Sequence, residues 1–298
     1  VGNWDEAGKE LSSVTELFER VSSKTRNMMR DVFWHDFVTA LRLLARTHEQ
    51  SKEFDLASNV YGRALELCRE HNSIPTLEAV LIFESFSFVS FQRGFQVEAL
   101  NWIEMAIALD GKEGCGQQTL LWTRKGHLLM DLNRGSESVA CMKTALDFAK
   151  ATVPAGTIEY AILLKNVGET SWVAGEFNEA ESFLRQAVSI WESGPDVQSD
   201  WRYGQCLYYL GMTRREDTTE SRKFLERSFL VMEKLENPRM WMVRLGFEQF
   251  CQASKKCQAL GCTLDATKQC SACSKGCYCS KEHQEIDWKR HKIMCLKN

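Results

Sequence analysis

Apolar residues recur at helical spacing along most of the chain, and a longer period is superimposed on them between residues 34 and 237. Small residues seven positions apart recur along this stretch, with a bulky residue between the two members of each pair. The small pairs are Ala57/Ala64, Ala99/Ala106, Ser138/Ala145, Ala180/Ala187 and Ser221/Ser228, and the bulky residues are Tyr61, Ile103, Met142, Leu184 and Leu225. The second small residue returns after 42, 39, 42 and 41 residues, a period that predicts structural repeats.

Each of these segments follows another apolar stretch, and the later stretches contain Gly126, Gly168 and Gly211. A small side chain lets the axis of one helix approach that of the next, and a bulky residue fills the groove between them. We therefore expect two helices in each repeat, packed closely against one another, and an all-α fold.

Residues 161–194 resemble the tetratricopeptide repeat. The matching motif positions are Gly168, Gly175, Phe177, Ala180, Leu184 and Ala187. The period near 41 residues resembles the longer repeats of kinesin light chain. The resemblance implies an α-solenoid of about five repeats over residues 34–237, with a groove for an extended or helical peptide from a partner protein. A generic stack of helices is the alternative, and it predicts the same all-α class.

The segments that flank the repeats are also apolar at helical spacing. Residues 5–30 read as an amphipathic helix, so we expect residues 1–33 to pack on the first repeat. Asn237-Pro238 ends the repeats, because proline disfavours a helical residue before it. Residues 240–254 then predict an apolar helix, and we expect residues 238–254 to cap the solenoid and to carry the module at residues 255–298.

This last module contains eight Cys and His residues spaced as metal ligands. They form four pairs, Cys257/Cys262, Cys270/Cys273, Cys279/His283 and His291/Cys295. Pairs two to four residues apart can close on one ion, so eight donors suit two tetrahedral Zn²⁺ ions. A seventh cysteine, Cys277, lies two residues before Cys279 on a predicted strand and points the other way, so we expect it not to be a ligand.

The same residues resemble the MYND zinc finger. The resemblance rests on Tyr278-Cys279-Ser280, His283-Gln284, Asp287-Trp288, His291-Lys292 and Cys295. It implies an interleaved order of binding to two structural zinc ions. The first set would be Cys257, Cys262, Cys279 and His283, and the second would be Cys270, Cys273, His291 and Cys295. The chain departs from the family in two ways, since four residues separate the first pair where two are usual, and His283 stands where Cys is commoner.

The resemblance also implies a binding site for short proline-containing peptides such as Pro-x-Leu-x-Pro. The positions that match this site are Gln284 and Trp288. We expect Trp288 to offer an apolar face and Gln284 a hydrogen bond to the peptide backbone. The alternative is that Trp288 only fills the core of the small finger.

Composition and charge narrow the possible compartments and partners. Seven of the twelve cysteines lie in the finger and the other five are scattered, which favours metal binding in a reducing compartment, the cytoplasm or nucleus, over a disulfide framework. The net charge of −3 combines +5 in residues 255–298 with −8 in the rest. Neither a secretory signal nor an eighteen-residue apolar run is present, so we expect no membrane partner. Because the chain starts with Val1, we expect it to be a piece of a longer protein.

Catalytic motifs are missing from the sequence. We find no nucleophile with its base, no paired carboxylates and no dinucleotide fingerprint, and four-coordinate zinc leaves no open position for water. The sequence therefore predicts a non-enzymatic scaffold for proteins. Two alternatives remain: a nucleic-acid- or chromatin-associated factor that uses Lys289, Arg290, Lys292 and Lys297 of the basic finger, or a non-catalytic relative of the methyltransferases that combine a SET domain with a MYND finger. We rate nucleic acid the less favoured partner, because no recognition-helix pattern accompanies the basic residues.

Overall fold

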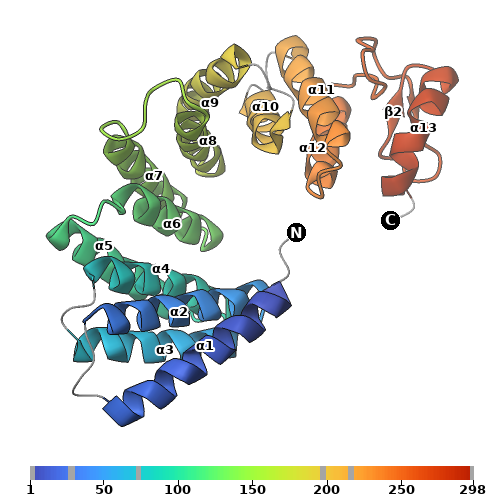
Figure 1. The fold of residues 1–298 in the computed structure, drawn as a ribbon. Helices are drawn as coiled ribbons and strands as arrows, with labels where there is room; N and C mark the ends of the chain where they lie inside the picture. The colour runs from blue at the N-terminus through green and yellow to red at the C-terminus, as the bar shows by residue number, and fades with distance from the viewer. Residues whose placement is uncertain (1–3, 26–30, 72–74, 195–198, 214–217, 296–298) are drawn as a thin grey trace. The chain divides into compact units, whose positions relative to one another are not determined.

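A computed structural model describes residues 4–25, 31–71, 75–194, 199–213 and 218–295 of the chain. The chain divides into two compact units, Val1–Phe148 and Ala149–Asn298. Both are built from helices, which pair into hairpins in the manner of tetratricopeptide repeats (Figure 1). No helix in the described residues is long and apolar enough to cross a membrane.

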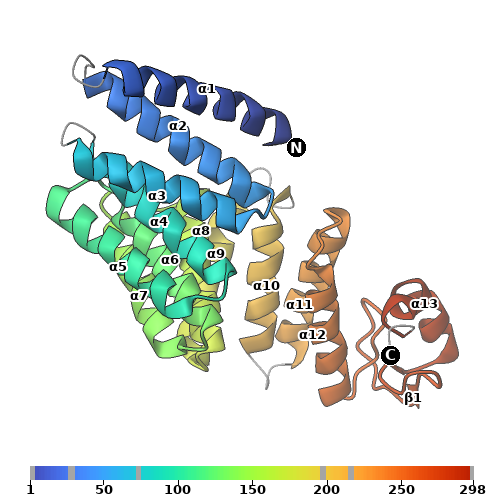
Figure 2. The same cartoon turned by 90° about the horizontal axis from the view of Figure 1, so that it is seen from below.

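The first unit contains a leading helix and three hairpins. Its helices are α1 (Trp4–Thr25), α2 (Asp31–Gln50), α3 (Phe54–Glu70), α4 (Thr76–Gln92), α5 (Gln96–Glu113), α6 (Gln118–Asp131) and α7 (Gly135–Ala149). Helix α1 packs along α2 (Figure 2). Between these helices the Phe18 ring stacks on the Phe37 ring, with 5.0 Å between the ring centroids. The expected N-terminal helix thus lies on the first hairpin, while the part expected at residues 26–30 falls outside the described residues.

The second unit contains two more hairpins, a further helix and the finger. Its elements are α8 (Ile158–Val173), α9 (Phe177–Ser193), α10 (Trp201–Thr213), α11 (Thr218–Lys234), α12 (Met240–Ala253), β1 (Lys268–Gln269), β2 (Cys277–Tyr278) and α13 (Lys281–Cys295). The two strands form an antiparallel ribbon in which Gln269 pairs with Cys277. Helix α12 packs on α11, and the finger lies beside α12 in both views (Figures 1 and 2).

The predicted small-against-bulky packing within the hairpins is confirmed. A Cβ atom added to Gly168 would lie 2.6 Å from Cγ of Leu184, and one added to Gly211 would lie 2.7 Å from Cγ of Leu225. These distances are shorter than a carbon–carbon contact allows, so each glycine lets the second helix of its hairpin approach the first. Gly175 has a different role. It lies in the turn between α8 and α9, and its φ of +83° belongs to the left-handed region, which glycine adopts readily.

A buried polar network joins the hairpins α8–α9 and α10–α11. The Tyr209 hydroxyl donates a hydrogen bond to Oε1 of Glu169 over 2.8 Å, and Lys165, four residues before Glu169, forms an ion pair with it. Both charged side chains are almost fully buried. Since a buried charge is costly unless it is paired, this network fixes how α8 and α10 pack.

Candidate metal centre

The structure brings the eight predicted ligands together as two groups of four. In one group are Cys257, Cys262, Cys279 and His283, and in the other are Cys270, Cys273, His291 and Cys295. Within each group the candidate donor atoms all lie within 4.8 Å of one another. This is the interleaved grouping that the family resemblance implies.

The donor chemistry and the spacing of each group fit a tetrahedral zinc ion. Zn–S bonds of about 2.3 Å and Zn–N bonds of about 2.0 Å place the donors of a tetrahedron about 3.5–3.8 Å apart. In the first group, the Sγ atoms of Cys262 and Cys279 are 3.7 Å apart, and Cys257 Sγ lies 3.7 Å from Nδ1 of His283. In the second, Cys270 Sγ lies 3.9 Å from Sγ of Cys295.

The two histidines present different ring nitrogens to their groups. His283 directs Nδ1 towards Cys279 Sγ, 2.9 Å away, whereas His291 directs Nε2 towards Cys273 Sγ, 3.3 Å away. The Nδ1 atom of His291 therefore faces away from the metal group, into the protein. This difference distinguishes two sites that share the same set of three thiols and one imidazole.

A tight turn of the backbone positions the first two cysteines of the second group. The chain turns tightly at Cys270–Ser274, where the Ser274 amide donates to the Cys270 carbonyl over 2.8 Å. Burial raises the pKa of the Cys270 thiol, but the backbone N–H groups of Cys273 and Ala272, together with the side chains of His291 and Cys273, outweigh it, and the pKa falls to about 6. A thiol that loses its proton near neutral pH is prepared to bind a metal ion.

Helix α13 carries three of the four ligands that form the last two pairs. His283, His291 and Cys295 lie on α13, whereas Cys279 precedes it. The Ser280 hydroxyl accepts a hydrogen bond from the His283 amide over 3.2 Å and so caps the first turn. Cys279 and His283 still meet, because the cap fixes the direction in which the chain enters the helix.

Cys277 is in neither group. Its buried thiol donates to the carbonyl of Lys256 over 3.2 Å, and burial raises its pKa to about 11. In the described part of the chain this cysteine is therefore a buried structural thiol on β2, and its neighbour Tyr278 fills the centre of the finger.

Helix α11 holds the loop between the first two ligands. The Arg222 guanidinium, only 4% exposed, donates to the carbonyls of Cys257 and Ala259 over 2.8 and 2.9 Å. Glu226, which also accepts from Arg222, accepts from the Gly261 amide over 3.0 Å. Two of the four residues between Cys257 and Cys262, Ala259 and Gly261, thus contact the helix. Sequence reasoning missed Arg222, and the unusual spacing was the signal that could have pointed to it.

Helix α12 supplies a carboxylate behind the second group. Glu248, 4% exposed, accepts from Gln258 over 3.0 Å, and its Oε1 atom lies 3.5 Å from Nδ1 of His291. The adjacent Glu248 carboxylate is the largest cause that raises the pKa of His291 to about 9. Sequence reasoning also missed Glu248, because a lone Glu in an apolar helix carries no motif.

The two predicted peptide-binding residues lie one helical turn apart on α13. Trp288 is 41% exposed and Gln284 is half-buried. Positions four apart share a helix face, so both side chains point to the same side. Tyr278 is fully buried in the finger core, whereas the Trp288 ring lies 6.0 Å from the His291 ring and stays partly exposed.

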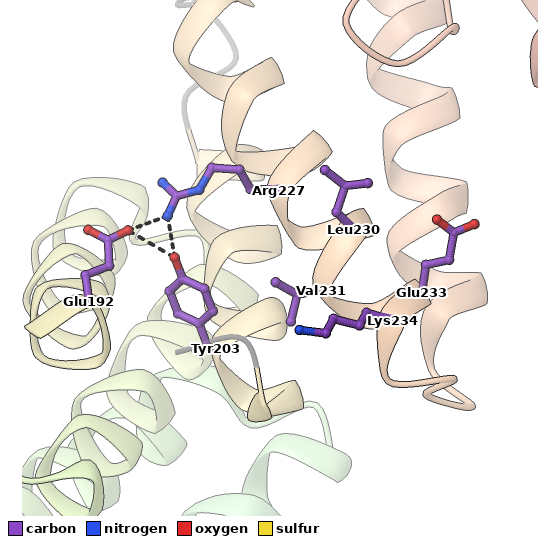
Figure 3. Close-up of a pocket in the computed structure, with 7 residues that line it drawn as sticks. All are labelled: Glu192, Tyr203, Arg227, Leu230, Val231, Glu233 and Lys234. Atoms are coloured by element: carbon purple, nitrogen blue, oxygen red, sulfur yellow. Dashed lines mark hydrogen bonds and ion pairs between the residues drawn. The ribbon is translucent and has the colours of Figure 1, made fainter. Parts of the chain in front are cut away.

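Among the surface hollows of the repeats within the described residues, two are lined by both charged and aromatic side chains. One, of about 570 Å³, is lined by residues of α9, α10 and α11, and Figure 3 shows Tyr203 and Glu192 both directed at Arg227. The other, of about 160 Å³, lies between α4 and α6, the first helices of successive hairpins, and is lined by Phe88 and His127. Charged and aromatic side chains share both hollows.

Comparison with known proteins places the finger in a family. Residues 251–295 match the MYND finger. The C-terminal module is a MYND-type zinc finger. A 40-residue stretch, 13% of the chain, is 50% identical to programmed cell death protein 2 of Bos taurus, and it covers 11% of that protein's length.

The helical part of this MYND-containing chain resembles solved repeat structures. BtubC (BKLC) from P. vanneervenii matches with a TM-score of 0.67 at 14% identity, over 80% of this chain and 94% of that one. The TPR-like repeats of a putative kinesin light chain from Podosopora anserina match with a TM-score of 0.55 at 13% identity, over 67% and 97%. A Rap protein in complex with Competence and Sporulation Factor matches with a TM-score of 0.54 at 16% identity, over 79% and 64%. At such identities the likeness shows the fold, which confirms the predicted tetratricopeptide-like class.

Proposed function

We propose that this protein is a non-enzymatic adaptor that binds two structural zinc ions in its finger and peptides of partner proteins through the finger and the repeats. Both modules are of kinds used for protein interaction. The two groups of four soft donors support the zinc assignment, because each completes a tetrahedron with protein ligands alone. Closed sites of this kind supply folding energy and leave no position for a metal-bound water. The adaptor would act in the cytoplasm or the nucleus, where the thiol ligands stay reduced.

The observation that carries the peptide-binding proposal is the exposed Trp288 beside Gln284 on α13. A flat indole face packs well against proline rings, and the neighbouring amide can bond to the backbone of an extended peptide. For the repeats, the hollow between α4 and α6 is the candidate groove, since an extended partner segment crosses the first helices of successive hairpins in such folds.

Calorimetric titration with a Pro-x-Leu-x-Pro peptide tests the finger. We expect the wild-type chain to bind and Trp288→Ala to weaken binding at least about tenfold, because truncating an aromatic anchor at an interface costs 1–2 kcal/mol or more. Ile286→Ala is the matched control, since Ile286 is 65% exposed on the same helix but two residues from Trp288, on the opposite face. Equal affinities of the wild type and Trp288→Ala, with two zinc ions retained in each, would contradict the proposal.

A further inference from the structure

The finger is attached to the repeats through buried polar contacts. Arg222 and Glu226 of α11 bind the backbone of the first-group loop, and Glu248 of α12 lies behind His291 of the second group. The space that remains between finger and helices, lined by Phe229 and Gln258 among others, measures about 10 Å³ and barely reaches the size of one water molecule. Because so little space remains, the interface holds the side chains of the finger and of the helices in fixed positions.

Each of the two helices contacts a different metal group, α11 the first and α12 the second. The Arg222 guanidinium fixes two carbonyls, one of which belongs to the ligand Cys257 itself. Its position above the Phe247 ring, 5.3 Å from the centroid, also holds the guanidinium in place. Without Arg222, the six-residue segment from Cys257 to Cys262 would lose its anchor, and a longer loop between two ligands would cost more entropy to close on an ion.

Glu248 acts on the other group through the imidazole of His291. The Nδ1 atom of His291 is buried and makes no hydrogen bond of good geometry, while Oε1 of Glu248 faces it at 3.5 Å. Metal-bound histidines generally donate their second N–H to a carboxylate or carbonyl, which fixes the ring and strengthens the bond to the metal. Glu248 has that position, and Arg244 and Gln258 both donate hydrogen bonds to the same Oε1 atom.

We propose that the two zinc sites are completed by the repeat domain, one helix for each site: Arg222 of α11 positions the first site and Glu248 of α12 positions the second. The widened spacing between Cys257 and Cys262 is then the adaptation that lets the first loop reach α11. This inference rests on the proposed binding of two zinc ions. It assigns Arg222 and Glu248 as positioning residues, since neither contacts the metal.

The test uses the full chain and follows zinc release to a colour-forming chelator, 4-(2-pyridylazo)resorcinol. We expect Arg222→Met to speed the release of one zinc equivalent about ten- to a hundredfold, Glu248→Gln to speed the release of the other, and the double variant to speed both. Lys223→Met and Glu233→Gln are matched controls, because both side chains are exposed on α11, and they should release zinc at the wild-type rate.

Long-range ¹H–¹⁵N spectra of the histidine rings identify which site is affected. His283 and His291 coordinate through different nitrogens, so their signals differ, and Glu248→Gln should shift those of His291 while leaving those of His283 unchanged. Should Arg222→Met fail to fold, Glu226→Gln tests the same loop with a nearly isosteric change.

Unchanged release rates in folded Glu248→Gln and in the Arg222 or Glu226 variant would overturn the inference, and so would variants that each loosen both ions equally. Native mass spectrometry of the wild type separates this failure from that of the proposed function. A chain purified without two zinc ions contradicts the proposed function, whereas two ions with unaltered variants contradict only the inference.

Discussion

Glu49 on α2 shows how one half-buried side chain sets a pH dependence. Burial raises its pKa to about 7, the hydrogen bond that Tyr61 donates to it over 2.6 Å works in the opposite direction, and the nearby Glu84 adds to the rise. Since the folded chain holds this proton more tightly than the unfolded chain, Glu49 adds most stability below pH 4.5, and this contribution is lost as the pH rises through 7.

Glu49→Gln should remove that dependence, because the amide keeps an oxygen for Tyr61 and does not ionise. We expect the free energy of unfolding of the variant to rise relative to that of the wild type between pH 5 and 8. The rise should be on the order of 1–2 kcal/mol, because the side chain is partly exposed. Denaturant midpoints of both proteins across this range measure the gain, and their difference cancels the titration of the shared metal ligands. A difference that is constant with pH would show that Glu49 titrates normally.

At the scale of the elements, the approach of two helices depends on the absence of a single carbon atom. Gly168→Ala would push a Cβ into the Leu184 side chain and the carbonyl of Ala180. We expect it to lower the free energy of unfolding by about 1–3 kcal/mol, as overpacking in a close-packed interior does.

Gly62 of α3 is the matched control for this substitution. A Cβ added there meets nothing within 4 Å, so Gly62→Ala should stabilise the protein by about 0.5–1 kcal/mol, because alanine favours a helix over glycine. Thermal unfolding followed by circular dichroism compares the two variants. If both glycines respond alike, helix propensity and not helix approach determines the effect at Gly168.

The sequence was most informative where a pattern repeats. The spacing of small and bulky residues predicted the helix hairpins. The pattern, with Met142 or Leu184 as its bulky residue, recurs five times, so it can be recognised even where a single repeat departs from the motif. The spacing of Cys and His likewise predicted how the donors group, since few arrangements of eight ligands satisfy two ions. The boundaries of the predicted domains and the peptide-binding roles of Gln284 and Trp288 stay predictions.

Contacts between elements could not be predicted, because single polar residues form them. Arg222 reads as one more charge in a polar helix, and Lys165 and Glu169, four residues apart, read as an ion pair on a helix surface although both are buried. Which of many charged residues is buried depends on how the helices pack, and the hydrophobic pattern does not fix that packing.

Within the second unit, the repeats and the finger share one polar interface, and this predicts the effect of metal removal. We expect a strong chelator to raise amide hydrogen exchange in the finger and also in α11 and α12, since the zinc-bound loops hold Arg222 and Glu248 in place. Exchange in α2–α5 of the first unit should not change. Mass spectrometry of the exchanged peptides measures this, and protection of α11 and α12 that survives chelation would show that the finger folds separately.

The Arg222 anchor gives free zinc a thermodynamic influence on the last hairpin of the repeats. An ion that binds only the folded state stabilises it in proportion to the logarithm of its free concentration. For each site above its dissociation constant, a tenfold fall in free zinc therefore removes about 1.4 kcal/mol of folding free energy. Arg222 couples the stability of α11 to that of the zinc-bound loop. A fall in free zinc would therefore destabilise the end of the repeat array well before the finger lost its zinc ions.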